Sequence, residues 1–177
     1  GNNGTVTTAG QNTFVGLNAG NLTMGSTATY SYEASFNTVI GFQSFFFNTT
    51  GSSNTTNGSY SLHSNTTGSS NIAIGFDSMH ANIAGNNNIA LGTNALYNTT
   101  ASSNTAIGYS SLFSNTNGSG NTALGFYAGY YLANGTTGRS TGDIGLYLGT
   151  HTKASADGTD NETVIGSYAI GAGSNKT

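Results

Sequence analysis

"SSNTAIGYSSLFSNTNGSGNTALGF", residues 102–126, contains one five-residue motif twice, first as NTAIG and then as NTALG. The glycine that closes each copy, Gly108 and then Gly125, recurs along the whole chain. The closing glycines are Gly16, Gly41, Gly58, Gly75, Gly92, Gly108, Gly125, Gly149 and Gly166. The intervals between them are 25, 17, 17, 17, 16, 17, 24 and 17. A period near 17 is too short for helical-hairpin repeats or propeller blades.

The positions around each closing glycine keep a constant chemical character. The residue before the glycine is aliphatic in eight of nine repeats, and the third residue after it is always small. A polar turn rich in Gly, Asn and Ser then follows, and these residues favour turns. Each repeat therefore predicts a strand, a glycine corner, a second strand and a turn. Stacked repeats predict an all-β fold, a parallel β-roll or β-solenoid of about 17-residue repeats.

A three-sided helix of hexapeptides ranks second, because no aliphatic residue recurs every six positions. Within the preferred fold, the fourth residue after the glycine is a core candidate in the central repeats. These residues are Phe45, Leu62, Met79, Leu96 and Leu112.

The asparagine that opens each motif predicts a ladder of amides that hydrogen-bond from coil to coil. Its members are Asn12, Asn37, Asn54, Asn71, Asn88, Asn104 and Asn121. The aliphatic residue before each glycine is expected to fill the core. The alanines beside it are expected to pack between chains, since one coil encloses little core of its own. The alanines are Ala73, Ala90, Ala106 and Ala123. This reasoning predicts a homo-oligomer.

Composition excludes several classes of protein. Charged residues make up 5% of the chain, where a typical domain has about 25%, and the net charge is −3. A chain without a basic field is not expected to bind nucleic acid. The sequence contains no run of about 18 apolar residues, so no membrane span is expected in this segment. The chain has no cysteine, which excludes disulfides and thiolate metal sites. The aromatic content of 11% and the recurrence of apolar residues at fixed offsets argue against disorder.

The two long intervals and the charged residues suggest a division of the chain. Residues 1–142 are expected to form the repeat array, with loop insertions near 21–35 and 126–143. Residues 143–177 are expected to form terminal repeats with a charged loop, because seven of the nine charged residues lie between Arg139 and Lys176. The chain begins and ends within repeat-like sequence, which favours a fragment or a processed product.

The motifs "NTAIGYSSL", "NIAIGFDSM", "NIALGTNAL" and "ETVIGSYAIGAGS" resemble the head repeats of YadA-type trimeric autotransporter adhesins and similar repeats of phage and prophage tail fibres. The resemblance covers nearly the whole chain. It implies a left-handed parallel β-roll, a homotrimer or fibre, and a role in adhesion or fibre building. YadA-type heads usually have a shorter repeat than this chain, which also shows no stalk heptads or anchor strands.

The fifth residue after the glycine carries a ring in six successive repeats. This aromatic column is Phe46, His63, His80, Tyr97, Phe113 and Tyr130. A line of rings suggests either a sugar-stacking strip or aromatic packing between chains. We expect the packing role, with the column buried between chains. The pair His63 and His80 is also a candidate metal site, although no third ligand shares the column.

Two further features suggest candidate sites near the surface. Asp157, Asp160 and Glu162 concentrate oxygen ligands in a glycine-containing loop, which suggests either a calcium site or a solvated end loop. Asn48, Asn65 and Asn98 lie in Asn-x-Ser/Thr sequons of the turns and are candidate glycan acceptors.

Catalysis is not expected. The chain has no repeated carboxylate pair, nucleophile elbow or phosphate-binding loop, so the sequence predicts no enzyme and no cofactor. The main expectation is a structural or adhesive module of an extracellular fibre, a cell-surface head or a virion fibre. Its expected partners are copies of itself, with a host-surface glycan or protein as a candidate. The alternatives are a carbohydrate-binding tail fibre and an ice-binding solenoid, although alternation of Thr and Ile in one column disfavours the last.

Overall fold

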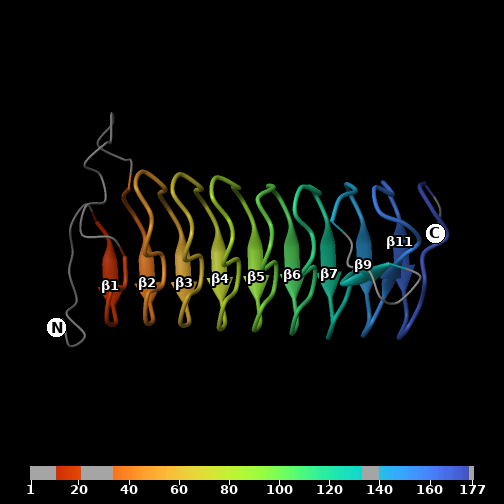
Figure 1. The fold of residues 1–177 in the computed structure, drawn as a ribbon, viewed down its shortest axis with the longest axis horizontal. Coiled ribbons are helices and arrows are strands. Elements are labelled where there is room, and N and C mark those ends of the chain that lie inside the picture. Colours follow the sequence, from red (N-terminus) through yellow and green to blue (C-terminus); the bar gives the residue numbers. More distant parts are fainter. Residues whose placement is uncertain (1–10, 21–33, 133–139, 176–177) are drawn as a thin grey trace.

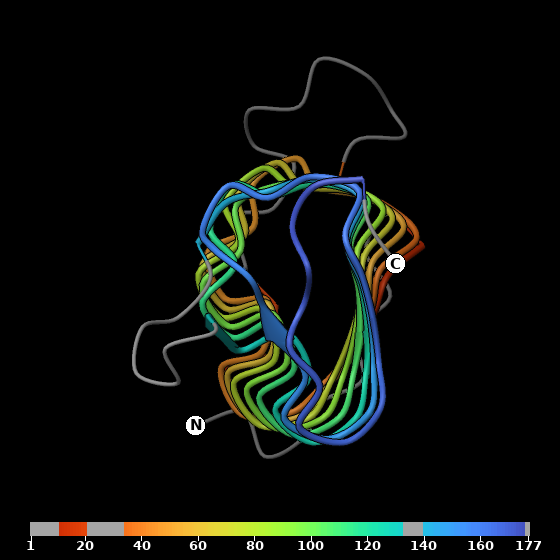
Figure 2. The same cartoon turned by 90° about the vertical axis from the view of Figure 1, so that its right-hand side faces the viewer.

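The computed structural model describes residues 11–20, 34–132 and 140–175. These residues form stacked coils around one long axis, and the strands lie side by side along it (Figure 1). Seen along the axis, successive coils superpose closely (Figure 2). The described residues contain strands and turns and no helix, and therefore no helix that could cross a membrane. The prediction of an all-β parallel β-solenoid is confirmed.

Nine strands form one parallel sheet, in the order β1-β2-β3-β4-β5-β6-β7-β9-β11. They are β1 Thr13–Val15, β2 Thr38–Ile40, β3 Thr55–Asn57, β4 Ile72–Ile74, β5 Ile89–Leu91, β6 Thr105–Ile107, β7 Thr122–Leu124, β9 Leu146–Leu148 and β11 Thr163–Ile165. A second sheet contains β8, Tyr131–Leu132, and β10, Lys153–Ala154.

Equivalent residues pair in every coil, and the two long intervals do not shift this register. β1 pairs with β2 across the first long interval, and β7 pairs with β9 across the second. Of the predicted loop insertions near 21–35 and 126–143, positions 21–33 and 133–139 lie outside the described residues.

The asparagine ladder forms as expected. The side-chain oxygen of Asn54, for example, accepts hydrogen bonds from the backbone N–H and the side-chain amide of Asn71, at 3.0 and 3.1 Å. The Asn54 amide donates to Asn37 Oδ1 and to the carbonyl oxygen of Gly68. All seven ladder asparagines are buried. The ladder therefore satisfies polar backbone groups inside the coil, where an unpaired group would be costly.

The inward asparagine determines which residues of the motif fill the core. Side chains alternate across a strand, so in Asn-Thr-Ala-Ile the asparagine and alanine point inward while the threonine and isoleucine point outward. Ala106 and Ala123 are fully buried within the single chain, whereas Leu124 is 50% exposed. The predicted places of the two columns were therefore wrong. The alanines belong to the chain's own core, and the aliphatic residues lie on its outer face.

Large core residues on the other side of the coil explain why the inward residue of the strand is small. The predicted core residues Phe45, Leu62, Met79, Leu96 and Leu112 are all fully buried and fill the coil from that side. Where a glycine replaces this residue, at Gly129, the fully buried ring of Tyr147 occupies the space instead. Large and small residues thus alternate between the walls to fill one narrow core.

The second predicted strand of each repeat is absent from the central coils. The second and fourth residues after the glycine adopt positive φ, as at Tyr60 (58°) and Leu62 (50°), so the chain turns instead of extending. Backbone bonds between coils continue through this segment, as from Leu62 N–H to the Ser78 carbonyl at 2.9 Å. The coil is therefore held by hydrogen bonds on walls that carry no regular strand.

Candidate functional site

The outer face of the nine-stranded sheet and the position just after each glycine corner together carry most of the exposed large hydrophobic side chains of the described residues. Two columns point outward from the strands: the third residue before each closing glycine and the residue immediately before that glycine. A third column, the residue after the glycine, follows at the corner where the strand ends. We call these 27 positions the apolar band. It contains Thr13, Val15, Leu17, Thr38, Ile40, Phe42, Thr55, Asn57, Ser59, Ile72, Ile74, Phe76, Ile89, Leu91, Thr93, Thr105, Ile107, Tyr109, Thr122, Leu124, Phe126, Leu146, Leu148, Thr150, Thr163, Ile165 and Ser167.

The apolar band concentrates exposed apolar surface without charge. Eleven of the seventeen large hydrophobic side chains that are exposed in the described residues belong to it, and none of its positions is charged. Ile40 is 40% exposed, Leu91 42% and Ile165 65%. Large exposed apolar patches on soluble proteins often mark interaction sites.

The six rings of the aromatic column form a continuous stack. Neighbouring centroids lie 5.0 to 5.8 Å apart, with interplanar angles between 10° and 27°. Each side chain is half-buried. The four inner rings are sandwiched between neighbours, so their faces are not free to stack on a sugar ring. In the single chain the column supports the coils, and its burial between chains stays a prediction.

The histidine pair within the column does not form a metal site in the described residues. His63 and His80 stack with centroids 5.0 Å apart, and His80 Nδ1 lies 2.9 Å from Asp77 Oδ1. Burial and the neighbouring His80 lower the pKa of His63, against an opposing effect of Asp77. No group of three or more His, Cys, Asp or Glu side chains in the described part of the chain is placed to hold a metal ion.

The three candidate calcium ligands each accept hydrogen bonds from different donors. Glu162 is fully buried, and its oxygens accept from Tyr147, Ser155, Thr159 and Gly173. Asp160 Oδ1 accepts from the Asp143 N–H, at 2.8 Å. Asp157 accepts from the N–H and hydroxyl groups of Ser140 and Thr141. The carboxylates therefore stabilise neighbouring coils, and their arrangement does not support a shared calcium site.

Asp157 provides a prediction about acid stability. Partial burial would raise the pKa of Asp157, but hydrogen bonds from Ser140 and Thr141 outweigh it and lower the pKa to about 2. Because the folded pKa lies below the unfolded value, the stabilisation is present above about pH 4 and is lost as the pH falls through about 2. Melting temperatures between pH 5 and pH 2 should fall more steeply for the wild type than for Asp157→Asn. Equal slopes would contradict this assignment.

Two of the three candidate glycan acceptors are inaccessible in the folded chain. Asn48 and Asn65 are fully buried, and the Asn65 amide donates to Asn48 Oδ1 at 2.9 Å. They begin a second ladder that continues through Asn82. This placement contradicts their assignment as acceptors in the folded protein. The next residue of this column after Asn82 is Thr99. Asn98 precedes Thr99, so it is not part of the column, and it is half-buried.

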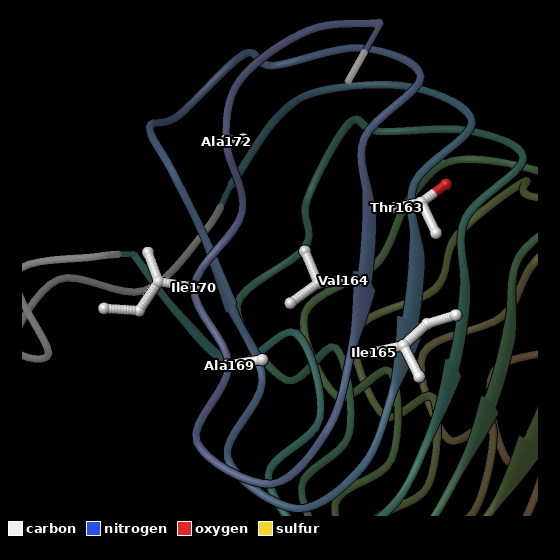
Figure 3. Close-up of a pocket in the computed structure, with 6 residues that line it drawn as sticks. All are labelled: Thr163, Val164, Ile165, Ala169, Ile170 and Ala172. Atoms are coloured by element: carbon white, nitrogen blue, oxygen red, sulfur yellow. The ribbon is translucent and has the colours of Figure 1, made fainter. Parts of the chain in front are cut away.

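A cavity of about 270 Å³ lies at the C-terminal end of the solenoid. Its lining residues are Thr163, Val164, Ile165, Ala169, Ile170 and Ala172. Val164 points into the coil, whereas Ile170 points away from it (Figure 3). None of the lining residues carries a titratable or nucleophilic group other than the Thr163 hydroxyl. The cavity therefore offers no catalytic arrangement.

No protein-family model matches the chain, and neither the curated proteins nor the solved structures searched contain a match.

Proposed function

We propose that this chain is a non-catalytic structural module of an extracellular fibre or surface head, whose copies associate side by side through the apolar band. The observation that carries the proposal is the band itself: none of its positions is charged, and eleven of them carry exposed large aliphatic or aromatic side chains. Burying such a face stabilises association by roughly 25 cal/mol per Å² of apolar area, before the costs of binding.

The construction of the coil also supports a structural role. Ladders of asparagine side chains and backbone bonds link every described coil to the next, and the core contains one line of close-packed residues. A surface that repeats at every coil suits a partner with the same repeat. A second copy of the chain has that repeat. The resemblance to adhesin heads and tail fibres is consistent with this role, and adhesion to a host-surface glycan or protein remains part of the proposal.

Leu124→Glu tests the proposed association. The side chain is half-exposed and points away from the core, so the folded monomer should tolerate the charge. Burying an unpaired carboxylate between copies is strongly unfavourable, and we expect the dissociation constant to rise at least tenfold, which is about 1.4 kcal/mol. Sedimentation velocity measures the change in association.

The matched control is Thr67→Glu. Thr67 is exposed in the polar turn, outside the apolar band, and the same charge there should leave association unchanged. If Leu124→Glu sediments like the wild type across the same concentrations, the apolar band is not the interface.

A further inference from the structure

One coil interrupts the apolar band with a complete polar rung. The three outward residues of the third coil are Thr55, Asn57 and Ser59. Asn57 is the one polar residue in the column before the closing glycines. In the sheet it lies between Ile40 of β2 and Ile74 of β4. In each of the eight remaining coils, the residue before the closing glycine is aliphatic.

Asn57 does not serve its own chain as the ladder asparagines do. It is exposed, and its side-chain amide forms no hydrogen bond with the described residues. The inward neighbour Thr56, by contrast, lies 2.7 Å from the Ser44 hydroxyl and is fully buried. In an isolated chain, water satisfies the Asn57 amide. In an assembly that buries the apolar band, the amide needs a polar partner.

The position of the polar rung along the sheet restricts how two copies can satisfy it. β3 is third among nine strands, so the rung is off centre. An antiparallel copy aligned end to end would place Asn57 opposite β7, whose outward residues include Leu124. A parallel copy slipped by one coil would place it opposite Ile40 or Ile74. A parallel copy in register brings Asn57 to Asn57 while all nine strands overlap. An antiparallel copy brings the two residues together only when it is shifted along the axis, and then β1 to β5 alone overlap.

We propose that Asn57 sets the register of a parallel assembly of identical chains, with the amides of Asn57 hydrogen-bonding to one another at the interface. The proposal rests on the proposed self-association through the apolar band. A single buried asparagine in an otherwise apolar interface acts in this way in coiled coils, where it selects register and oligomer state at a cost in stability. Here the same physical rule applies to a sheet face.

The test uses the absence of cysteine from the chain. A spin label on Ala156→Cys, an exposed position near the C-terminal end, reports distances between copies by pulsed electron paramagnetic resonance. In-register parallel copies should give one narrow distance component. Antiparallel copies would separate the labels along the axis by roughly eight strand spacings of about 4.8 Å, or about 38 Å. Slipped copies would add further components.

Asn57→Ile removes the polar rung and should leave the chain folded and associated, with an equal or higher melting temperature. We expect its distance distribution to split into at least two components. The double variant Asn57→Ile/Ile74→Asn moves the polar position by one coil and should restore a single component. That recovery would not follow if Asn57 merely stabilised its own coil.

The outcomes separate the two proposals. If Asn57→Ile keeps the single narrow component of the wild type, Asn57 does not set the register, although self-association stands. If the double variant fails to restore one component while remaining associated, the inference is also overturned. If the labelled wild type gives no distance between copies and sediments as a monomer, the proposed self-association fails and the inference fails with it.

Discussion

Gly92→Ala is expected to destabilise the folded solenoid strongly. Gly92 has φ of +137°, and an added Cβ would lie 2.6 Å from the backbone oxygen of Gly108 in the next coil. Backbone strain at such a residue costs about 1–3 kcal/mol, and overpacking adds about 1–3 kcal/mol. The clash is with backbone, so no side-chain rotation relieves it. Coils would have to separate and weaken the bond between Gly108 N–H and the Leu91 carbonyl.

Thermal unfolding followed by circular dichroism measures this effect. A loss of about 4 kcal/mol should lower the melting temperature by roughly 10 °C in a chain of this size. Gly173→Ala is the matched control, because Gly173 also has positive φ (109°) but no atom within 4 Å of the added Cβ. Similar losses for both variants would show that backbone conformation, and not the contact between coils, explains the glycine.

Asn88→Ala should produce the second large loss of stability. Asn88 Oδ1 accepts from the Asn104 N–H at 2.9 Å, and its amide donates to the Ala101 carbonyl at 2.9 Å. Alanine would leave both backbone groups without these partners inside the coil. Each unsatisfied buried group costs about 1–3 kcal/mol, so the free energy of unfolding should fall by about 2–5 kcal/mol.

Chemical denaturation provides the measurement, and Asn98→Ala provides the control. The half-buried Asn98 side chain lies outside the ladder, so its replacement should change stability by less than about 0.5 kcal/mol. Equal midpoints for Asn88→Ala and Asn98→Ala would contradict a structural role for the ladder.

The sequence alone predicts the stacking of coils because the period is visible in residues that have a direct physical task. Asparagine recurs where buried backbone groups need a partner, and glycine recurs where neighbouring coils touch. The residues four positions after the glycine, such as Leu62 and Leu96, are large and apolar in successive repeats and are fully buried. These tasks depend on the coil itself and on no other molecule.

The orientation of the NTAIG motif is harder to predict because hydrophobicity alone points the wrong way. Isoleucine and leucine are more apolar than alanine, so hydrophobicity favours burial of the aliphatic column. The decisive signal is the alternation from the inward asparagine, which puts Ala123 inside and Leu124 outside. An aliphatic column on the outer face favours a partner that covers it.

The roles of the acidic residues depend on contacts that no motif reveals. Asp143 and Asp160 belong to an outer column in which a backbone N–H of one coil donates to a side-chain oxygen of the next coil. Earlier in the column, Ser69 N–H donates to Asn86 Oδ1. Further along, Ser119 N–H donates to Asp143 Oδ1. Serine, asparagine and aspartate share the ability to accept one such bond. Sequence reasoning groups the carboxylates as ligands because it cannot align these positions across the second long interval.

The mass of the wild-type chain in solution, measured by multi-angle light scattering over a range of concentrations, tests the central claim most directly. The chain has a mass of 17.9 kDa. Association through the apolar band predicts a discrete multiple of that mass, which returns toward the mass of one chain in Leu124→Glu. A wild type that is folded and stays at the mass of one chain at every concentration would contradict the account.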